Sequence, residues 1–240
     1  MINHIVHSRP LCYTDLYFSD SFERVYIMKN GLKKNKLGKR ILLYSLGSVV
    51  MAFGIAAVIR VDFGVAPGSV VPYSLSLLTP LSVGMCSAFF QIFCIIMQLL
   101  LTGKFSIKLL LQFPLAYLFG LLLDLFVYLL DFSVSSILYC ILLTTGGLLV
   151  FSLGIRAIVG SDLFIMPTDG LAKTMGEKLG WPMSKGKLLF DIIVTAAGIL
   201  LMLIFYGNAF ISVNIGTVIC AAGTGPLIGL YTKLFPALDA

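Results

Sequence analysis

Six long apolar stretches, separated by polar or Gly- and Pro-rich connections, dominate the chain from Ile41 onward. They span residues 41–60, 84–102, 109–130, 137–158, 187–206 and 215–235. Each is close to the roughly 20 residues that a helix needs to cross the hydrocarbon core of a bilayer. Backbone polar groups at that depth must be satisfied within their own segment. The pattern therefore predicts an all-α membrane protein with six transmembrane helices.

The composition excludes the main alternatives to a membrane protein. Hydrophobic residues make up 59% of the 240 residues and charged residues 12%, with a mean hydropathy of +1.01. A soluble domain would be about 25% charged. Glycine and proline are scattered without a period, and five cysteines are too few for a disulfide-rich secreted scaffold. Only an integral membrane protein fits these values.

The cysteines and histidines form no pattern typical of a metal or redox site. No two cysteines make a C-x-x-C pair, and His4 and His7 are far in sequence from the cysteines of the apolar stretches. Buried packing cysteines are the simpler interpretation. We therefore expect neither a metal ion nor another cofactor.

Residues 1–40 are a polar, basic segment that we expect to be partly disordered. A charged stretch of this length before the first apolar core is not a secretory signal. Met28 begins a more natural start, so residues 1–27 are either a poorly ordered extension or the product of an upstream start codon. The lysines and the arginine between Lys33 and Arg40 abut a span without interleaved aromatic residues. They indicate a topology anchor rather than a nucleic-acid site.

Basic residues fall on alternate sides of the six predicted spans. With the N-terminus inside, the cytoplasmic side holds the N-terminal cluster, Lys104, Lys108, Arg156, Lys173, Lys178, Lys185, Lys187 and Lys233. The outer side holds only Arg60, at the end of the first span. This asymmetry follows the positive-inside rule. We predict a multi-pass protein of the cytoplasmic membrane with both termini in the cytoplasm.

The sequence resembles itself at a spacing of 100 residues. FGIAAVIRVDFGVAP, which starts at Phe53, lies over LGIRAIVGSDLFIMP, which starts at Leu153, and the same offset pairs Gln91 with Asp191. The identical pairs are Gly54 with Gly154, Ile55 with Ile155, Ala57 with Ala157, Asp62 with Asp162 and Pro67 with Pro167. A duplication is the economical interpretation. It divides the chain into a first half, 41–130, and a second half, 131–240.

Each half contains three spans, so the second half enters the membrane from the opposite side. Two connections, 61–83 and 159–186, are too long for simple turns, and each carries an Asp, a Gly/Pro-broken stretch and a short helical pattern. We expect two inverted three-helix repeats with broken or re-entrant segments after the first and fourth helices, as in many secondary transporters. The candidate hinges are Gly64, Pro67, Gly68, Pro167 and Gly170.

These residues resemble the YitT/YczE family of bacterial integral membrane proteins. The resemblance is carried by FGIAAVIRVDFGVAP, by LSVG from Leu81, by PTDGLA from Pro167 and by VNIGTVICAAGTGPLIGL from Val213, and it extends from 41 to 235. It implies a six-helix protein of the bacterial cytoplasmic membrane and no known substrate. The family tends to have Pro-Trp-Asp after the first span, whereas Gly68 and Ser69 follow Pro67 here; the second half keeps Asp169.

Ionisable and polar groups inside the apolar stretches are candidates for a substrate or ion pathway, because they are costly at that depth. The candidates are Asp124, Asp191, Gln91, Asp62, Asp162 and Asp169. Asp124 is either a pathway residue or an interfacial residue that reaches the membrane surface. Asp191 follows Lys187 by four residues, so a local ion pair competes with a pathway role. Asp62 and Asp162 are either N-caps of the broken segments or a gate or cation site, with Arg60 and Arg156 as countercharges.

Asp124 is expected to face the bundle interior and to contact a polar group of a neighbouring span. The candidate partners by depth are Gln91, Gln98, Thr144 and Thr145. In the sixth span a small-residue face is formed by Gly216, Gly223, Gly225 and Gly229. The last two have G-x-x-x-G spacing, which is typical of close helix packing within the bundle or at a homodimer seam.

Two functions fit these features, and an enzyme does not. The leading hypothesis is a permease for a small molecule or ion that works by alternating access between the two halves. The alternative is an accessory or assembly protein that transports nothing and uses its apolar bundle as a docking surface. No span carries a histidine, a G-x-S-x-G or an H-E-x-x-H motif, so we expect no catalytic activity. The only certain partner is the lipid bilayer.

Overall fold

The computed structural model describes residues 37–103, 107–132, 134, 136–208 and 210–238. The predictions for residues 1–36, including the alternative start at Met28, therefore lie outside the described residues. Residues 37–40, which we assigned to the polar N-terminal segment, are helical.

The described residues form eight α-helices, and six of them are long and apolar enough to span a membrane. These six are α2 (Leu37–Val61), α4 (Val83–Thr102), α5 (Ile107–Leu129), α6 (Ile137–Ser161), α8 (Met183–Tyr206) and α9 (Ile215–Leu234). The predicted six-span, all-helical architecture is confirmed. α2 and α8 each begin four residues before the predicted start, because lysine and arginine are good helix formers and continue the helix beyond its apolar part.

Two short helices interrupt this series at the predicted broken segments. A 3₁₀ turn, η1 (Pro67–Ser69), leads into α3 (Val70–Leu78), and α7 (Pro167–Lys178) follows α6. Proline opens both elements, where its missing N–H leaves no hydrogen bond unmade. A second 3₁₀ turn, η2 (Pro236–Leu238), follows α9. The order of a long helix, a short helix and two long helices thus occurs twice.

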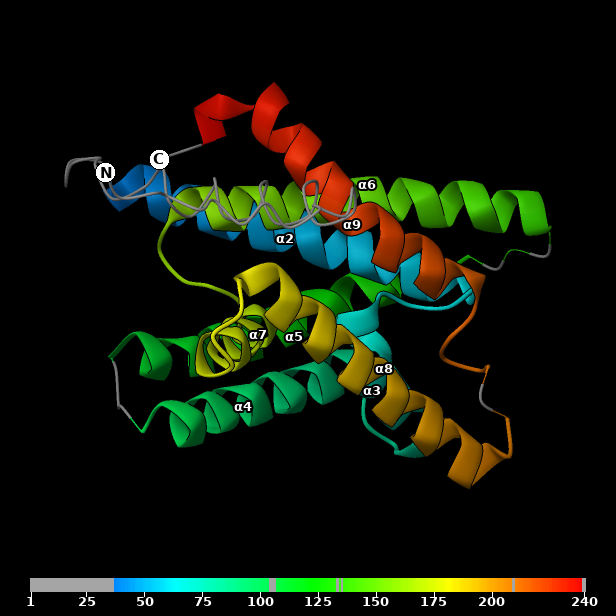
Figure 1. Cartoon of the computed structure of the whole chain (residues 1–240). Coiled ribbons are helices and arrows are strands. Elements are labelled where there is room, and N and C mark those ends of the chain that lie inside the picture. The colour runs from blue at the N-terminus through cyan, green and yellow to red at the C-terminus, as the bar shows by residue number, and fades with distance from the viewer. Residues whose placement is uncertain (1–36, 104–106, 133, 135, 209, 239–240) are drawn as a thin grey trace, which may run out of the picture.

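α2 and α6 run side by side along the molecule, and α9 crosses them on one face (Figure 1). The remaining helices lie on the other side of this pair. Four glycines bring the backbones of α2 and α6 close together in reciprocal contacts: Gly54 with Phe151, Gly154 with Met51, Gly47 with Ile158, and Gly147 with Val58. The four contacts form two pairs. Adding 100 to the α2 residue and subtracting 100 from the α6 residue converts one contact of a pair into the other. A closely packed helix pair therefore forms the centre of the fold.

The turns after α2 and α6 have the same backbone geometry. Asp62 and Asp162 have φ of 54° and 53° and are the only non-glycine residues with positive φ among those described. Ala66 and Met166, which precede the two prolines, have ψ of 143° and 142°. The two aspartates directly follow α2 and α6 and lie five residues before Pro67 and Pro167, where the short elements begin. Because Ala66 and Met166 are the N-caps there, the predicted N-cap role is wrong. The αL conformation, which Asp tolerates, explains their position at a helix C-terminus.

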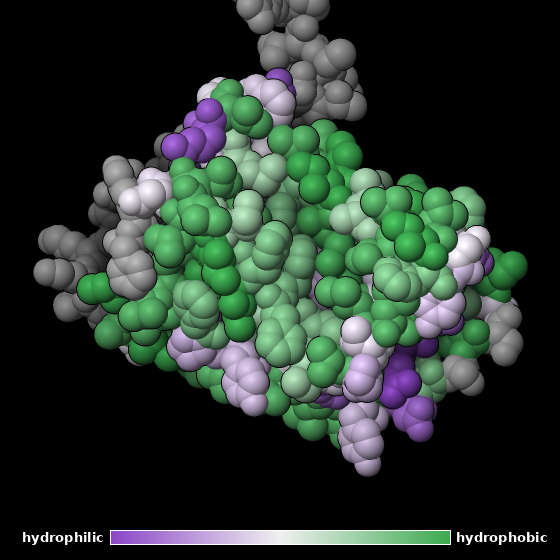
Figure 2. All heavy atoms as spheres, turned by 90° about the horizontal axis from the view of Figure 1, so that it is seen from below, coloured by the Kyte–Doolittle hydropathy of each residue, from purple (hydrophilic) through white to green (hydrophobic). Residues whose placement is uncertain are grey.

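The outer surface is strongly apolar. Figure 2 shows a face dominated by hydrophobic residues, with hydrophilic residues gathered near its edges. Large exposed side chains include Phe89, Phe93, Leu100, Leu188 and Ile204. Apolar surface on this scale marks a contact with lipid or another apolar partner. Together with the six candidate spans, it indicates a multi-pass membrane protein in contact with the bilayer.

Candidate functional site

A cavity of about 90 Å³, here called the central cavity, lies where the two halves meet. Its wall is mostly apolar and includes Met51, Ile55, Phe90, Phe119, Phe151, Ile155, Met166 and Ile228. Its polar part is formed by Ser69, Ser87, Gln91, Thr168, Asp169, Lys187, Asp191 and Thr224. Each half contributes both apolar and polar residues. Three of the predicted pathway candidates, Gln91, Asp169 and Asp191, are therefore brought together.

Three charged side chains form an ionic trio on one wall of the central cavity. Lys187 Nζ lies 3.1 Å from Asp169 Oδ1 and 3.0 Å from Asp191 Oδ1. The three side chains are 14% to 25% exposed, so the trio is largely shielded from solvent. The predicted local pair of Lys187 with Asp191 is confirmed, and Asp169 joins it from α7. Whether Asp191 also serves a pathway stays a prediction.

The trio is held by two helices and an aromatic ring. Asp169 lies in the first turn of α7, where a carboxylate interacts favourably with the helix dipole. Lys187 and Asp191 are one turn apart on α8. The ammonium group of Lys187 also lies 5.3 Å from the centre of the Phe190 ring, a distance typical of a cation–π contact. Lysine thus makes three favourable contacts in an apolar environment.

Gln91, on α4, lines the same cavity and carries a buried, unpaired acceptor. Its side chain is 4% exposed, and its Oε1 has no hydrogen-bond partner among the described residues. A buried polar atom without a partner costs about 1–3 kcal/mol. An acceptor in this state is a place where a bound molecule could donate a hydrogen bond.

The candidate hinge residues surround the beginnings of the short helices. Pro67 and Gly68 line the central cavity, and Gln98 Nε2 donates a hydrogen bond of 2.9 Å to the Pro167 carbonyl. Gly170 packs against the side-chain amide of Gln98, which would have to shift to admit a Cβ. Gly64 has φ of 97° and lies against Asn214. Gly68, by contrast, has open space around it. A hinge at these positions stays a prediction.

A second cavity, of about 310 Å³, adjoins the central cavity. The two share Met51, Ile155, Met166 and Asp169. The second cavity extends to Asp162 and Glu177, whose side chains are 41% and 63% exposed. It therefore reaches the molecular surface at the end where α6 meets α7.

Asp124 lines neither cavity, and its carboxylate instead accepts hydrogen bonds from the start of α4. Ser82 Oγ donates a hydrogen bond of 2.5 Å to its Oδ2, and the Gly84 N–H donates one of 2.6 Å to Oδ1. Ser82 is also the N-cap of α4 and accepts a hydrogen bond from the Met85 N–H. The predicted partners Gln91, Gln98, Thr144 and Thr145 are therefore wrong. Depth along α5 could not show that its end meets the start of α4.

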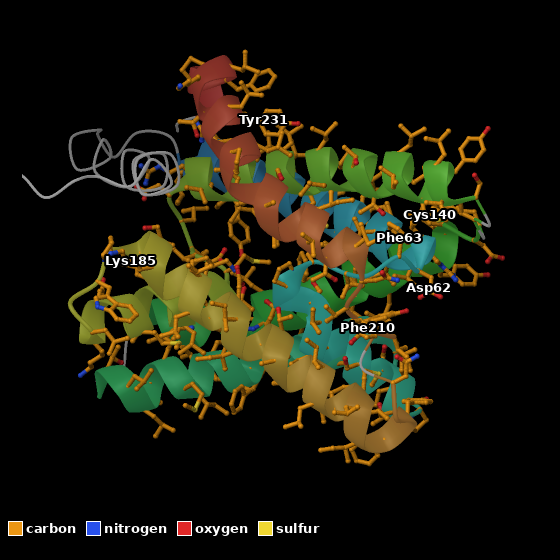
Figure 3. The ribbon with its side chains drawn as sticks, turned by 45° about the vertical axis from the view of Figure 1, so that its right-hand side comes forward. Asp62, Phe63, Cys140, Lys185, Phe210 and Tyr231 are labelled. Atoms are coloured by element: carbon orange, nitrogen blue, oxygen red, sulfur yellow. The ribbon has the colours of Figure 1, made fainter. Side chains whose placement is uncertain are left out.

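Asp62 and Asp162 also lie outside the central cavity. Figure 3 shows Asp62 beside Phe63 at one end of the molecule and Lys185 at the other end. The Tyr73 hydroxyl donates a hydrogen bond of 3.0 Å to Asp62, and burial together with this carboxylate raises the pKa of Tyr73. Arg60 donates to the Val127 carbonyl rather than to Asp62.

Asp162 is paired with Arg40, 3.5 Å away, at the start of α2. Arg156, the other predicted countercharge, is fully buried and donates a hydrogen bond of 3.3 Å to the Phe235 carbonyl after α9. Asp162 also lines the second cavity. It is thus the one candidate of this pair that borders a cavity.

The glycines of α9 have different surroundings. Gly216 donates a backbone hydrogen bond of 2.9 Å to the Phe63 carbonyl, and Gly223 lies against the Leu148 side chain. A helix-packing role for these two glycines stays a prediction. Gly225 is buried and lines the central cavity, and Gly229 is buried. A dimer seam at these glycines stays a prediction.

Sequence reasoning missed several polar residues of the central cavity. Ser87 and Thr224 were not among the candidates, and Lys187 was considered only as a partner of Asp191. The offset of 100 residues that pairs Gln91 with Asp191 also pairs Ser87 with Lys187. That signal was available in the sequence. Among the described residues no group of three or more His, Cys, Asp or Glu could hold a metal ion, and the described cysteines are free and buried.

Comparisons with known proteins give one result. Neither the curated proteins nor the solved structures contain a match to this chain. One family, described as a family of unknown function (DUF6198), matches residues 38–233, which include all six candidate spans apart from their outermost residues. The chain therefore belongs to the DUF6198 family.

Proposed function

We propose that the protein is a permease for a small solute and that the central cavity is its solute site. The observation that carries this proposal is the ionic trio of Asp169, Lys187 and Asp191 beside an unpaired Gln91 Oε1 in a cavity between the halves. Charged and unpaired polar groups inside a membrane protein are costly and are found where a solute or ion passes. A protein that only docks partners on its apolar surface has no need of such a site.

The proposal includes an inverted duplication of the two halves. It is supported by the reciprocal contacts of α2 and α6, in which Gly54 meets Phe151 and Gly154 meets Met51. The helix contacts correspond in the same way. α2 contacts α5 as α6 contacts α9, and α4 of the first half contacts α7 of the second as α8 of the second half contacts α3 of the first. Reciprocity of this kind is typical of elements related by a two-fold axis. In transporters with inverted repeats, interrupted helices meet at the solute site near the middle of the bilayer.

Alternating access is supported by the difference between the two ends of the molecule. At the α6–α7 end, the second cavity leads from the surface to Asp169 beside the central cavity. At the opposite end, the Val65 N–H donates to the Ser212 carbonyl, and the Gly216 N–H donates to the Phe63 carbonyl. These backbone bonds hold the loop after α2 against the loop before α9. Under the proposal, a solute approaches through the second cavity in this conformation.

We further propose that the open end faces the cytoplasm. Lys173, Lys178 and Lys185 lie on or next to α7, at the end where α2 begins, and basic residues favour the cytoplasmic side. The likeness to the YitT/YczE family supports a bacterial cytoplasmic membrane as the location. The proposal includes no catalytic activity.

Cysteine accessibility tests the permease without knowledge of its solute. Ser87→Cys would be placed in a background from which the native cysteines are removed, and the protein would be reconstituted in sealed vesicles with one orientation. We expect a membrane-impermeant methanethiosulfonate reagent to modify this cysteine from either side, because alternating access exposes the cavity to both. Thr145→Cys, on the exposed surface of α6, is the control and should stay unmodified. Modification from one side alone would favour the accessory alternative.

A further inference from the structure

We infer that the central cavity binds a small organic cation, a protonated amine with a short apolar body, whose ammonium group donates a hydrogen bond to Gln91 Oε1. This inference rests on the proposed function, because it names the solute class of the same site. It draws on four properties of the cavity: an unpaired acceptor, a surplus negative charge, the correspondence of the two halves, and an aromatic wall.

The unpaired acceptor selects a ligand with a hydrogen-bond donor. Gln91 is 4% exposed, and among the described residues nothing donates to its Oε1. A carboxylate ligand has only acceptors to offer and would leave this oxygen unpaired. An ammonium group has three donors and would satisfy it. The Gln91 oxygen therefore favours amines over carboxylates.

The ionic trio selects a cation. Two carboxylates, Asp169 and Asp191, face a single ammonium group on Lys187, so the trio carries one surplus negative charge. In a mostly apolar cavity such a charge is weakly screened and attracts a mobile cation. An anion would be repelled by the same charge. A proton is the simplest competitor, so amine binding should weaken as the pH falls.

The correspondence of the halves shows where the ammonium group would lie. Lys187, Asp191 and Asp169 correspond, at the offset of 100 residues, to Ser87, Gln91 and Ser69, and all six line the central cavity. In the second half, acceptor side chains surround a lysine ammonium group. In the first half, acceptors occupy the corresponding positions, but Ser87 is too short to supply the ammonium group. A ligand ammonium group takes the place of the missing lysine.

The remaining wall suits a short apolar body. Phe90, Phe119 and Phe151 line the cavity, and aromatic faces attract cations. The cavity volume of about 90 Å³ is well above the roughly 10–15 Å³ that one water molecule needs. The cavity therefore has room for a small amine such as propylammonium.

Equilibrium binding tests this inference directly. The full chain in lipid nanodiscs would be titrated with propylammonium, 1-propanol and propionate in an amine-free buffer at pH 8, followed by calorimetry. We expect saturable binding of propylammonium with a Kd of about 0.1 to 10 mM, and no saturable binding of propionate. A propylammonium Kd above about 10 mM, or binding of propionate as tight as that of propylammonium, would overturn the inference.

Matched variants place the bound amine. Gln91→Leu and Asp191→Asn should each weaken propylammonium binding by about tenfold or more. Gln112→Leu is the first control, because Gln112 is also buried with an unpaired Oε1 but lines only the second cavity. Asp62→Asn is the second control, outside both cavities. Equal loss in a test variant and its control would overturn the assignment to the central cavity.

A lysine at position 87 gives a test that does not depend on loss of an interaction. Ser87→Lys should bring a tethered ammonium group to the proposed site, abolish propylammonium binding and raise the thermal unfolding temperature. Unchanged propylammonium binding in a folded Ser87→Lys variant would overturn the inference. If amine binding is found while Ser87→Cys reacts from one side only, the cation site stands and the permease fails. If instead Ser87→Cys reacts from both sides and propylammonium does not bind, the permease proposal stands and the amine inference fails.

Discussion

Replacement of Lys187 by methionine is the sharpest test of the ionic trio. Lys187→Met keeps a long unbranched side chain but removes the ammonium group, so Asp169 and Asp191 lose their shared partner. Lys187 Nζ is 3.1 Å and 3.0 Å from the two carboxylates, and all three side chains are at most 25% exposed. Two largely buried carboxylates would remain close together without a countercharge.

The distances set the size of the effect. At an effective dielectric constant of about 20, two unit charges 3 Å apart attract by about 5 kcal/mol. Part of this attraction offsets the desolvation of the lysine, and removal of one partner from a buried ion pair typically costs about 3–5 kcal/mol. We expect Lys187→Met to lower the free energy of unfolding by this amount at pH 8. The loss should be smaller at pH 5, because a carboxylate can then take up a proton and become neutral.

Reversible unfolding in mixed detergent micelles would measure this loss. Lys185→Met is the matched control: it lies on the same helix, is exposed and makes no ion pair with a described residue. The double variant Lys187→Met/Asp191→Asn should regain part of the lost stability, because one unpaired charge is removed. A loss below about 1 kcal/mol in Lys187→Met, the value of a surface ion pair, would refute the reasoning. Additive losses in the double variant would refute it as well.

Three further predictions concern the packing of α2 against α6, the hydrogen bonds of Asp124 and the membrane topology. Gly54→Ala should cost about 1–3 kcal/mol, measured in the same unfolding assay, because the new Cβ would lie 2.7 Å from the Phe151 Cα; Gly146→Ala, with open space around it, should cost nothing. Asp124→Asn should lower stability by about 1 kcal/mol and leave propylammonium binding unchanged. With a cytoplasmic N-terminus, a cysteine at 134 should react from outside intact cells, and one at 178 only after permeabilisation; external reaction at 178 would contradict the proposed topology.

The spans and the broken segments could be predicted from the sequence because each has a strong local cause. A helix that crosses lipid needs about 20 apolar residues, and Pro67 and Pro167 each open a short helix where a proline is tolerated. The predicted first residues of α2 and α8 were less accurate. The apolar pattern ends at the edge of the hydrocarbon core, whereas the helix continues beyond it. Backbone hydrogen bonds continue through Lys39, Arg40 and Lys185.

The candidate site could be predicted only in part, because a sequence gives depth along a helix but not the neighbour that the residue faces. In the sequence, Asp191 and Asp124 look equivalent, because each is an acid within an apolar stretch. Asp191 lines the central cavity, whereas Asp124 binds the start of α4. What separates them is the close approach of Gly84 and Gly120, which brings the end of α5 onto α4. That approach depends on tertiary packing and leaves no periodic signal.

The chain is held differently at the two ends of the molecule. Val65 and Ser212 pair through a backbone hydrogen bond of 3.4 Å, and the Ser74 hydroxyl donates to the Ser212 hydroxyl. At the α6–α7 end, the Gln112 side chain donates to the Ile165 carbonyl at 3.0 Å, beside the second cavity. The loop after α2 is thus held by a direct backbone contact, and the loop after α6 by a longer side-chain bridge. Under the permease proposal, this side-chain bridge lies at the end where the second cavity reaches the surface, so it is the contact that a closing movement would replace.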